Sequence, residues 1–450
     1  MFCFRRLGAL ILAVLLTVSM VLPVSAADPL ADTADWLQKN VTAPTVASIG
    51  GEWAVIGLAR SDIDVPRKWY DAYYDNVKAY VKVCGGVLHK RKYTEYSRVV
   101  LALTAIGKDP ANVAGYDLLK PLSDFEATVW QGVNGAIWAL IALDSGSYPS
   151  ALRQGYVDHI VERQLSCGAW ALSGENPDTD VTAMALQALA KYRTQADVKK
   201  AIDRALTWLS KTQNSDGSFS VEGIPTCEST AQVLVALGAL GIDHTDQRFV
   251  KGGNTAEQGL LSFYTAGKGF SHTRNGGTDG MATEQAFYAL VSLQRQREDR
   301  PALYDICPFA DLKNHPNRKA ILALYDRDIV NGMGDGSFSP DATMTRAQFC
   351  TMVSRALDLE PVYRPVFSDV KQSHWYGGWV SAANAKGIVN GVGNDRFDPE
   401  GAIIGQHAAL MVNRAAKVLG VSHTAVNHSA QPIRRCEMAQ MVYDLLEAAR

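Results

Sequence analysis

A helical pattern rich in alanine and leucine recurs through the first two thirds of the chain and limits what this chain can fold into. The first alanines of the ALxAL-like cores are separated by 37, 46, 51 and 53 residues and are Ala102, Ala139, Ala185, Ala236 and Ala289. Periods of this length are typical of a repeated pair of helices. The pattern therefore predicts an all-α repeat architecture.

The recurring segments are apolar on nearly every face, which predicts helices that are surrounded by protein on all sides. Their small side chains allow close helix packing. More polar segments alternate with them, for example Ala196 to Gln213. In this segment charged and apolar residues fall on opposite faces of a helix. An inner and an outer layer of helices, repeated five or six times, close most simply into a double-layered helical barrel.

Two glutamine-containing turns connect this pattern with known proteins. QNSDGSFS, from Gln213 to Ser220, resembles the glutamine-glycine-aromatic turn of squalene and oxidosqualene cyclases, and QLSCGAW, from Gln164 to Trp170, is a looser version. The alanine-rich helices are similar to the inner helices of prenyltransferase and terpene-cyclase toroids. The resemblance implies an α/α-toroid over residues 28–306. It is specific for the fold and unspecific for the function.

A different repeat follows the toroid. Segments that begin at Phe309 and Phe367 are 58 residues apart, and their turns NGMGDGSFSPD, from Asn331, and NGVGNDRFDPE, from Asn390, are 59 apart. This agreement indicates a true repeat. The units resemble S-layer homology (SLH) repeats, which fasten bacterial proteins to the cell wall. We expect repeats at 307–362, 363–420 and, shortened to its second helix, 421–450.

The amino terminus has the pattern of a secretory signal. Arg5 and Arg6 precede an uncharged run from Leu7 to Val24, and small residues follow at the predicted cleavage point after residue 26. A transmembrane anchor at the same place is the alternative. Cleavage would leave a chain without a membrane anchor. The formal charge of −2 and the lack of any basic block argue against nucleic-acid binding.

Two aspartates precede one of the inner helices. The segment DTDVTA, from Asp178 to Ala183, resembles the D-x-D-D-T-A motif with which terpene cyclases protonate an alkene. The resemblance assigns the acid to Asp180, but Val181 stands where the motif has another aspartate, which weakens the tuning of a strong acid. The simpler interpretation is that Asp178 or Asp180 caps the helix. Capping is favoured, and the two roles are compatible.

Zinc-dependent prenyl transfer is not supported by the sequence. Cys227 falls near the cysteine ligand of that family, but Pro225 replaces the aspartate and the expected histidine region has none. A site that lacks two of its three ligands does not hold zinc. We therefore predict no metal and no cofactor.

The inner helix starts of a toroid border its central hole, where a small molecule could bind. The predicted cavity residues are acidic groups at helix starts and nearby aromatic rings: Asp180, Glu228, Glu284, Trp130, Trp138, Tyr264 and Tyr288. The alternative for each aromatic ring is ordinary core filling.

The SLH resemblance implies that an arginine in a T-R-A-E stretch grips an acidic cell-wall polysaccharide, often one carrying pyruvyl ketals. Repeat one has TRAQ, with Arg346, and repeat three has RRCE, with Arg435. Repeat two has GQHA, from Gly405, and no arginine. A surface ion pair is the alternative role of Arg346.

Together these features predict an exported cell-surface protein that SLH repeats anchor non-covalently to the wall of a bacterium. The toroid then binds a small ligand or has a structural role. The alternative is an enzyme like a terpene cyclase that uses Asp180 as a general acid.

Overall fold

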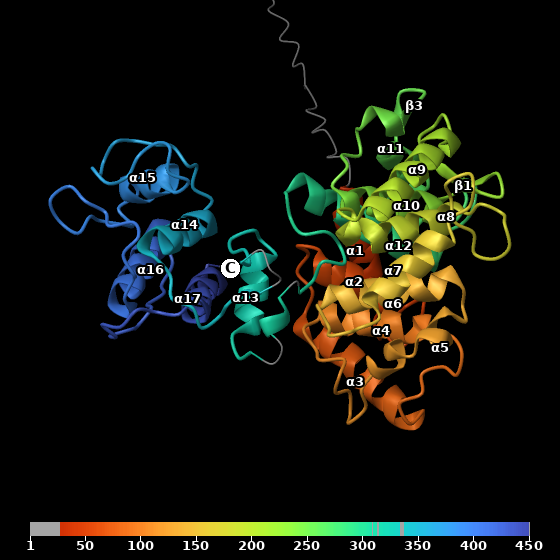
Figure 1. Ribbon diagram of the computed structural model, residues 1–450, viewed down its shortest axis with the longest axis horizontal. Coiled ribbons are helices and arrows are strands. Elements are labelled where there is room, and N and C mark those ends of the chain that lie inside the picture. The colour runs from red at the N-terminus through yellow and green to blue at the C-terminus, as the bar shows by residue number, and fades with distance from the viewer. Residues whose placement is uncertain (1–27, 308, 313–314, 334–336, 450) are drawn as a thin grey trace, which may run out of the picture.

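The computed structural model describes residues 28–307, 309–312, 315–333 and 337–449 (Figure 1). The predicted signal peptide, residues 1–26, lies outside these ranges. A helical ring and a smaller helical bundle are joined through residues 298–317 (Figure 1). Within the described ranges, no helix is long and apolar enough to cross a membrane.

Six helices form a closed inner ring. They are α2 (Glu52–Arg60), α4 (Thr94–Ala105), α6 (Val133–Ser145), α8 (Thr179–Leu189), α10 (Cys227–Leu240) and α12 (Gly280–Arg297). Each packs against the next in this order, and α12 returns to α2. All five predicted alanine-rich cores lie on these helices and are buried. The chain thus forms the predicted α/α-toroid.

More polar helices cover the ring. They are α1 (Pro29–Asn40), α3 (Arg67–Val83), α5 (Phe125–Val129), α7 (Arg153–Glu162), α9 (Ala196–Thr212) and α11 (Ala256–Leu261), with the 3-10 turns η1 (Lys120–Ser123), η2 (Ala190–Tyr192) and η3 (Gln247–Phe249). Helix α9 coincides with the amphipathic segment expected in the outer layer, and it buries its apolar stripe, including Ile202 and Leu209, against the ring.

Two-stranded antiparallel hairpins lead into the later helices. They are β1 (Phe219–Val221) with β2 (Ile224–Thr226), β3 (Val250–Lys251) with β4 (Asn254–Thr255), and β5 (Tyr264–Thr265) with β6 (Gly269–Phe270). The registers pair Phe219 with Thr226, Val250 with Thr255 and Tyr264 with Phe270.

Three inner helices share one kind of start. The capping side chains of α8, α10 and α12 belong to Asp178, Thr226 and Asp279, and each accepts a hydrogen bond from a backbone N–H three residues on. Four residues after each cap stands a threonine whose hydroxyl accepts a backbone N–H from the extended segment before the helix. These threonines are Thr182, Thr230 and Thr283. The sequence predicted that Glu284 lies at a helix start, and this is wrong. Asp279 caps α12, so the helix begins at Gly280.

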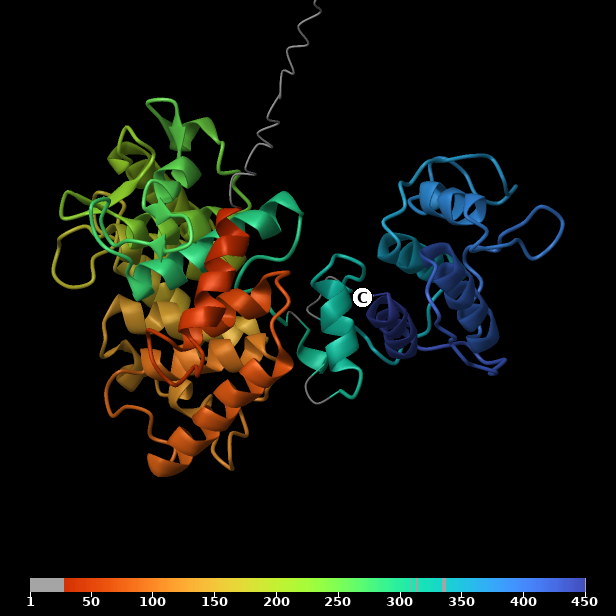
Figure 2. The ribbon, with the colours of Figure 1, turned by 180° about the vertical axis from the view of Figure 1, so that it is seen from behind.

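The second module is a helical bundle to which the three repeats contribute, and each repeat is called a lobe below (Figure 2). Its elements are η4 (Ala310–Leu312), α13 (Arg318–Tyr325), α14 (Arg346–Ala356), α15 (Gly377–Ala385), α16 (Gly405–Leu419) and α17 (Arg435–Ala448). Helices α14, α16 and α17 pack together in the centre, while α13 covers α17 and α15 covers α14. In the third repeat α17 is the sole helix among the described residues of 421–449, as its sequence suggested.

Backbone hydrogen bonds link the three lobes in a cycle. The N–H of Arg346 donates to Gly401, that of Gly405 to Gln431, and that of Arg435 to Ala342, at 2.9, 3.2 and 2.8 Å from the carbonyl oxygens. The residue of repeat two that corresponds to Arg346 and Arg435 is therefore Gly405. This lobe has no arginine there, as the sequence indicated.

Gly217, in the QNSDGS turn, lies in close contact with the backbone of a neighbouring loop. Its φ is +85°, and an added Cβ would lie 2.1 Å from the carbonyl oxygen of Thr255, whereas Gly223 has φ +80° and open space. Gly223→Ala should cost roughly 1–2 kcal/mol of unfolding free energy, from left-handed backbone strain alone. Gly217→Ala should cost about 1–3 kcal/mol more, from the steric clash.

Urea unfolding of the two variants, followed by circular dichroism, measures this difference. Equal losses of stability in both would contradict the tight contact between Gly217 and Thr255.

Candidate functional sites

The two aspartates ahead of α8 have different roles. The Asp178 side chain accepts the N–H of Val181 at 2.9 Å and is the cap, so the favoured prediction of capping is confirmed for Asp178. Asp180 lies in the first turn beside the Ser229 hydroxyl, and its Oδ1 is buried and unpaired among the described residues. Burial, reinforced by Asp178 and Glu228, raises the pKa of Asp180 to about 6.

Glu228 occupies the matching position at the start of α10. Its carboxylate lies 2.8 Å from Nδ1 of His272, which stands on the loop before α12. Burial raises the pKa of Glu228, while His272 opposes the shift. The carboxyl groups of Asp180 and Glu228 both lie close enough to Tyr288 to raise the pKa of its buried phenol further. The structure thus brings Asp180, Glu228 and Tyr288 into one group.

Aromatic side chains meet across the middle of the ring. Trp53 on α2 has its ring 5.1 Å from that of Trp138 on α6 and 5.9 Å from that of Tyr288 on α12, measured between centroids. Helices α2 and α6 are not neighbours in the ring, so these side chains point toward its axis. Trp138 and Tyr288 were predicted to do so, and Trp53 was missed.

Amide side chains form a chain beside these rings. Nε2 of Gln187 donates to Oε1 of Gln232 at 3.0 Å, and Nε2 of Gln232 donates to the Tyr288 hydroxyl at 2.6 Å and to Gln285 at 3.0 Å. Oε1 of Gln187 remains buried without a donor among the described residues. The sequence signal for these residues was a polar side chain inside each otherwise apolar helix.

Glu284 lies one turn inside α12. Its Oε1 accepts the N–H of Gly50 at 2.7 Å, and its Oε2 is buried without a partner among the described residues. Burial, together with the nearby carboxylates of Glu52 and Asp279, raises the pKa of Glu284 to about 7. Glu52 has Arg98 at 2.7 Å as its counterion, whereas Glu284 has none among the described residues.

The other two predicted cavity residues make their contacts elsewhere. Trp130 is 58% exposed, with the Arg91 guanidinium over its ring. Tyr264 donates its hydroxyl to Asp32 on α1, in the outer layer. Neither has a described contact with the group around Asp180, because both belong to segments that cover the ring and not to its inner face.

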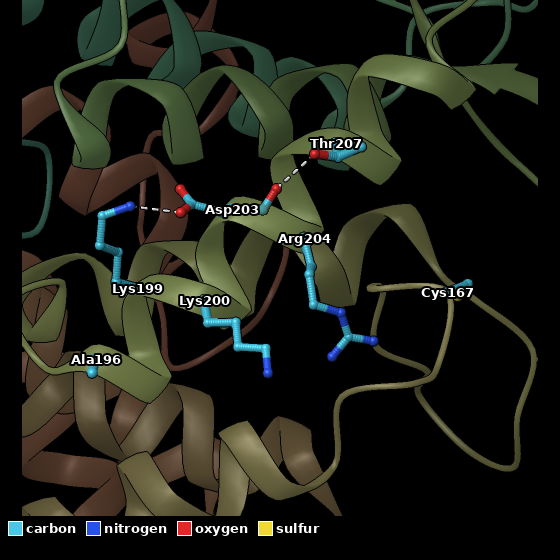
Figure 3. A pocket seen from close by; sticks show the side chains of 7 residues that line it. All are labelled: Cys167, Ala196, Lys199, Lys200, Asp203, Arg204 and Thr207. Carbon is cyan, nitrogen blue, oxygen red and sulfur yellow. Dashed lines mark hydrogen bonds and ion pairs between the residues drawn. The ribbon is translucent and has the colours of Figure 1, made fainter.

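An open hollow of about 450 Å³ lies on the outer surface, along α9 (Figure 3). Its lining includes Lys199, Lys200 and Arg204, together with the exposed thiol of Cys167. Lys199 pairs with Asp203 at 2.6 Å (Figure 3). Arg204 donates to the carbonyl oxygens of Leu165 and Ser166. None of the predicted site residues lies here.

In the bundle, Arg346 and Arg435 occupy equivalent positions. The Nε of Arg346 donates to the carbonyl of Phe397 at 2.9 Å and its Nη2 to that of Asn390 at 3.2 Å. Arg435 makes the same two bonds to Phe338 and Asn331, at 2.9 and 3.0 Å. Each arginine therefore lies against the glycine-rich turn of the neighbouring lobe.

Both guanidinium groups stack on a phenylalanine, at 4.8 Å over Phe397 and 4.4 Å over Phe338. Arg346 is 6% exposed and bonds to carbonyls, so the alternative of a surface ion pair is wrong. Burial lowers the pKa of both arginines, with carboxylates only at a distance. Within the described residues, neither Nη1 has a hydrogen-bond partner.

The third equivalent position, at Gly405, is filled by Asn427. A Cβ added to Gly405 would lie 2.2 Å from Oδ1 of Asn427. Asn427 belongs to the linker that replaces the first half of repeat three, and that linker supplies no phenylalanine on which an arginine could stack. The described residues of the bundle thus contain two stacked arginines at equivalent positions.

Comparison with known proteins agrees with this arrangement. Residues 308–350 and 366–409 match the S-layer homology domain. The chain carries SLH domains. SLH domains bind cell-wall polysaccharide in general, so this is a surface protein anchored to a bacterial cell wall.

Curated relatives match about a quarter of this chain. A cell surface protein of Thermoanaerobacter kivui is 38% identical over 115 residues, which are 24% of this chain and 15% of that protein. The exoglucanase XynX of Acetivibrio thermocellus is 35% identical over 112 residues, 25% of this chain and 10% of that protein. This chain thus spans a small part of these relatives' length.

Solved structures resemble the toroid weakly. The type II terpene cyclase MstE from Scytonema matches with 15% identity and a TM-score of 0.42, over 60% of this chain and 99% of that one. An ent-copalyl diphosphate synthase from Streptomyces platensis has 20% identity and a TM-score of 0.37, over 54% and 49%. Because these scores are low, the toroid fold rests on the helix contacts described above.

The raised pKa of Glu284 predicts how stability depends on pH. The folded state holds a proton on Glu284 between about pH 4.5 and 7, which the unfolded state has released, so stability falls as pH rises through this window. Glu284→Gln removes this loss. Relative to the unaltered protein, the variant should gain about 3 kcal/mol between pH 4 and pH 8.

Urea unfolding at five pH values between 4 and 8 gives both curves. Glu175→Gln, at an exposed loop position, is the matched control and should follow the unaltered protein. Parallel curves for Glu284→Gln and the unaltered protein would contradict the burial of an unpaired carboxyl.

Proposed function

We propose that Arg346 and Arg435 bind acidic groups of a secondary cell-wall polysaccharide. The observation that carries this proposal is a stacked guanidinium at each position whose hydrogen bonds, among the described residues, go to uncharged carbonyl oxygens. Within the described ranges neither arginine forms an ion pair, and a carboxylate on the polymer would supply a counterion.

Nη1 of each arginine, which has no hydrogen-bond partner among the described residues, is the donor available to that carboxylate. Stacking on Phe397 or Phe338 fixes the plane of the guanidinium, so an incoming acid meets an oriented donor. A pyruvyl ketal is a suitable acidic group, since its carboxylate projects from the sugar ring and needs one planar partner.

Co-sedimentation with purified cell-wall sacculi tests this role. Arg346→Ala should weaken binding tenfold or more, in line with the loss of a charge-assisted hydrogen bond, which is worth roughly 1.5–3 kcal/mol. Arg355→Ala is the matched control, because Arg355 is on the same helix but lies at the surface over Trp379. Equal sedimentation of both variants and the unaltered protein would remove Arg346 from the site.

We further propose that the toroid holds a small ligand at its axis, between Asp180 and the aromatic rings of Trp53, Trp138 and Tyr288. Unpaired acceptor oxygens on Asp180 and Gln187 support a ligand that donates hydrogen bonds. Native mass spectrometry of the purified chain, with and without Asp180→Asn, tests this. A bound mass that is lost in the variant is expected, and no bound mass in either would argue for a structural role.

One observation favours an enzyme as the second candidate function. A carboxyl with a pKa of about 6 is protonated in part near neutral pH and can donate that proton, as the acid of a terpene cyclase does. However, Val181 is buried where a second carboxyl would strengthen the acid. Incubation with squalene or geranylgeranyl diphosphate should yield no cyclised product, and a product that Asp180→Asn abolishes would establish the enzyme instead.

A further inference from the structure

Three arginines of the toroid hold one carboxylate of the anchor. Asp326 follows α13, in the first SLH repeat, and its carboxylate oxygens accept hydrogen bonds from Arg60 at 2.5 Å, Arg295 at 2.8 Å and Arg300 at 2.7 Å. Arg300 also donates its Nε to the backbone carbonyl of Asp326 at 2.8 Å. We call these four residues the junction cluster.

The toroid holds these arginines in position independently of Asp326. Arg60 and Arg295 are 4% and 1% exposed. The Nε of Arg60 donates to the carbonyl of Leu303 at 3.0 Å, and Nη1 of Arg295 donates to the carbonyl of Arg60 at 3.0 Å. Two buried like charges in contact are costly without a counterion. Among the described residues, Asp326 is the one carboxylate within 4.0 Å of both.

The electrostatics of Asp326 agree with this role. Burial alone would raise the pKa of its carboxyl, but Arg60, Arg295 and Arg300 together hold that pKa well below its usual range. An acidic residue at the carboxyl end of a helix is disfavoured by the helix dipole. Asp326 is therefore better explained by its contact with the toroid than by the stability of α13.

Comparison of the repeats within this chain supports the same conclusion. By the 59-residue offset, the position of Asp326 in repeat two is Ala385. Repeat two does not face the toroid (Figures 1 and 2). The carboxylate is thus present in the repeat that meets the ring and absent from the repeat that does not.

The contact lies at one particular face of the ring. Arg60 ends α2, Arg295 is in the last turn of α12, and the carbonyl of Ser145, which ends α6, accepts the N–H of Cys307 at 2.7 Å. These are carboxyl ends of inner helices. The ring helices run the same way, so the amino ends with Asp180 and Glu228 lie on the opposite face.

From this geometry we propose that the first SLH repeat docks onto the carboxyl-end face of the toroid through Asp326. The docking holds the ring in one orientation, in which the face that carries Asp180 and Glu228 points away from the anchor. The orientation with respect to the wall rests on the proposed binding of the bundle to wall polysaccharide, whereas the docking itself does not.

A native thiol reports on this docking. Cys307 is 2% exposed and lines the cleft between the modules, whereas Cys167 is exposed on the outer layer. Asp326→Ala, which copies Ala385, should increase the rate of maleimide labelling at Cys307 at least tenfold in the full chain, read by peptide mass spectrometry. Labelling of Cys167 should not change, and it is the internal control. Glu360→Ala, a surface change in the bundle, should leave both rates unaltered.

Small-angle scattering of the same proteins gives an independent measurement. The unaltered chain should fit one rigid arrangement, and Asp326→Ala should increase the radius of gyration. Because the alanine variant leaves Arg60 and Arg295 without an ion-pair partner among the described residues, Asp326→Asn serves as the milder change, and circular dichroism checks that the toroid remains folded. Unchanged Cys307 labelling and scattering in both folded variants would overturn the proposal.

Binding to sacculi separates this proposal from the anchoring function. Asp326→Ala should sediment like the unaltered protein, because Arg346 and Arg435 lie within the bundle. Loss of sedimentation in Arg346→Ala, together with unchanged Cys307 protection, would support anchoring and docking as independent properties. Full Cys307 protection with no sedimentation of the unaltered protein would refute anchoring alone.

Discussion

Close packing between the first and last inner helices is the contact on which the toroid depends. Gly57 on α2 lies so near α12 that an added Cβ would be 2.7 Å from a ring carbon of Phe287. Gly238 on α10 meets Ser292 on α12 in a similar way, at 2.5 Å from its hydroxyl oxygen. Small residues at these points bring the helix axes close together. Closure of the ring then gathers the amino ends of its helices on one face.

That gathering has an electrostatic consequence. Glu52, Asp180 and Glu228 come from segments far apart in the sequence, yet each stands in the first turn of a ring helix. The helix dipole favours a carboxylate at such a place, while burial opposes its charge. Burial is the larger effect for all three, since each pKa is raised. The protonation of these three carboxyl groups is therefore set by their buried surroundings more than by the helix dipole.

The sequence predicted those parts of the structure that repeat. The alanine-rich cores identified five ring helices, and the paired turns identified the anchor repeats, because both recur at spacings that a single element does not explain. Helix α2 was missed, since its nine residues, EWAVIGLAR, contain no Ala-Leu pair. The start of α12 was placed too late, because Glu284 was taken as the acidic start that Asp279 provides.

Contacts between distant segments could not be predicted in the same way. Trp53 meets Trp138 across the ring, and Asp326 meets three arginines of another module; no local pattern encodes either pairing. In the sequence, Asp326 is one acid among several in its repeat. Its difference from Ala385 becomes informative only when the structure shows which repeat faces the toroid.

The filled third position has a consequence for how long the protein would stay on the wall. If Arg346 and Arg435 bind the polysaccharide as proposed, one polymer chain can be held at two points of the same bundle. Release of one point leaves the other engaged, and rebinding is then intramolecular, at an effective concentration on the order of millimolar. Each rebinding event lengthens the residence time, and because Asn427 fills the position at Gly405, the proposed valency is two instead of three.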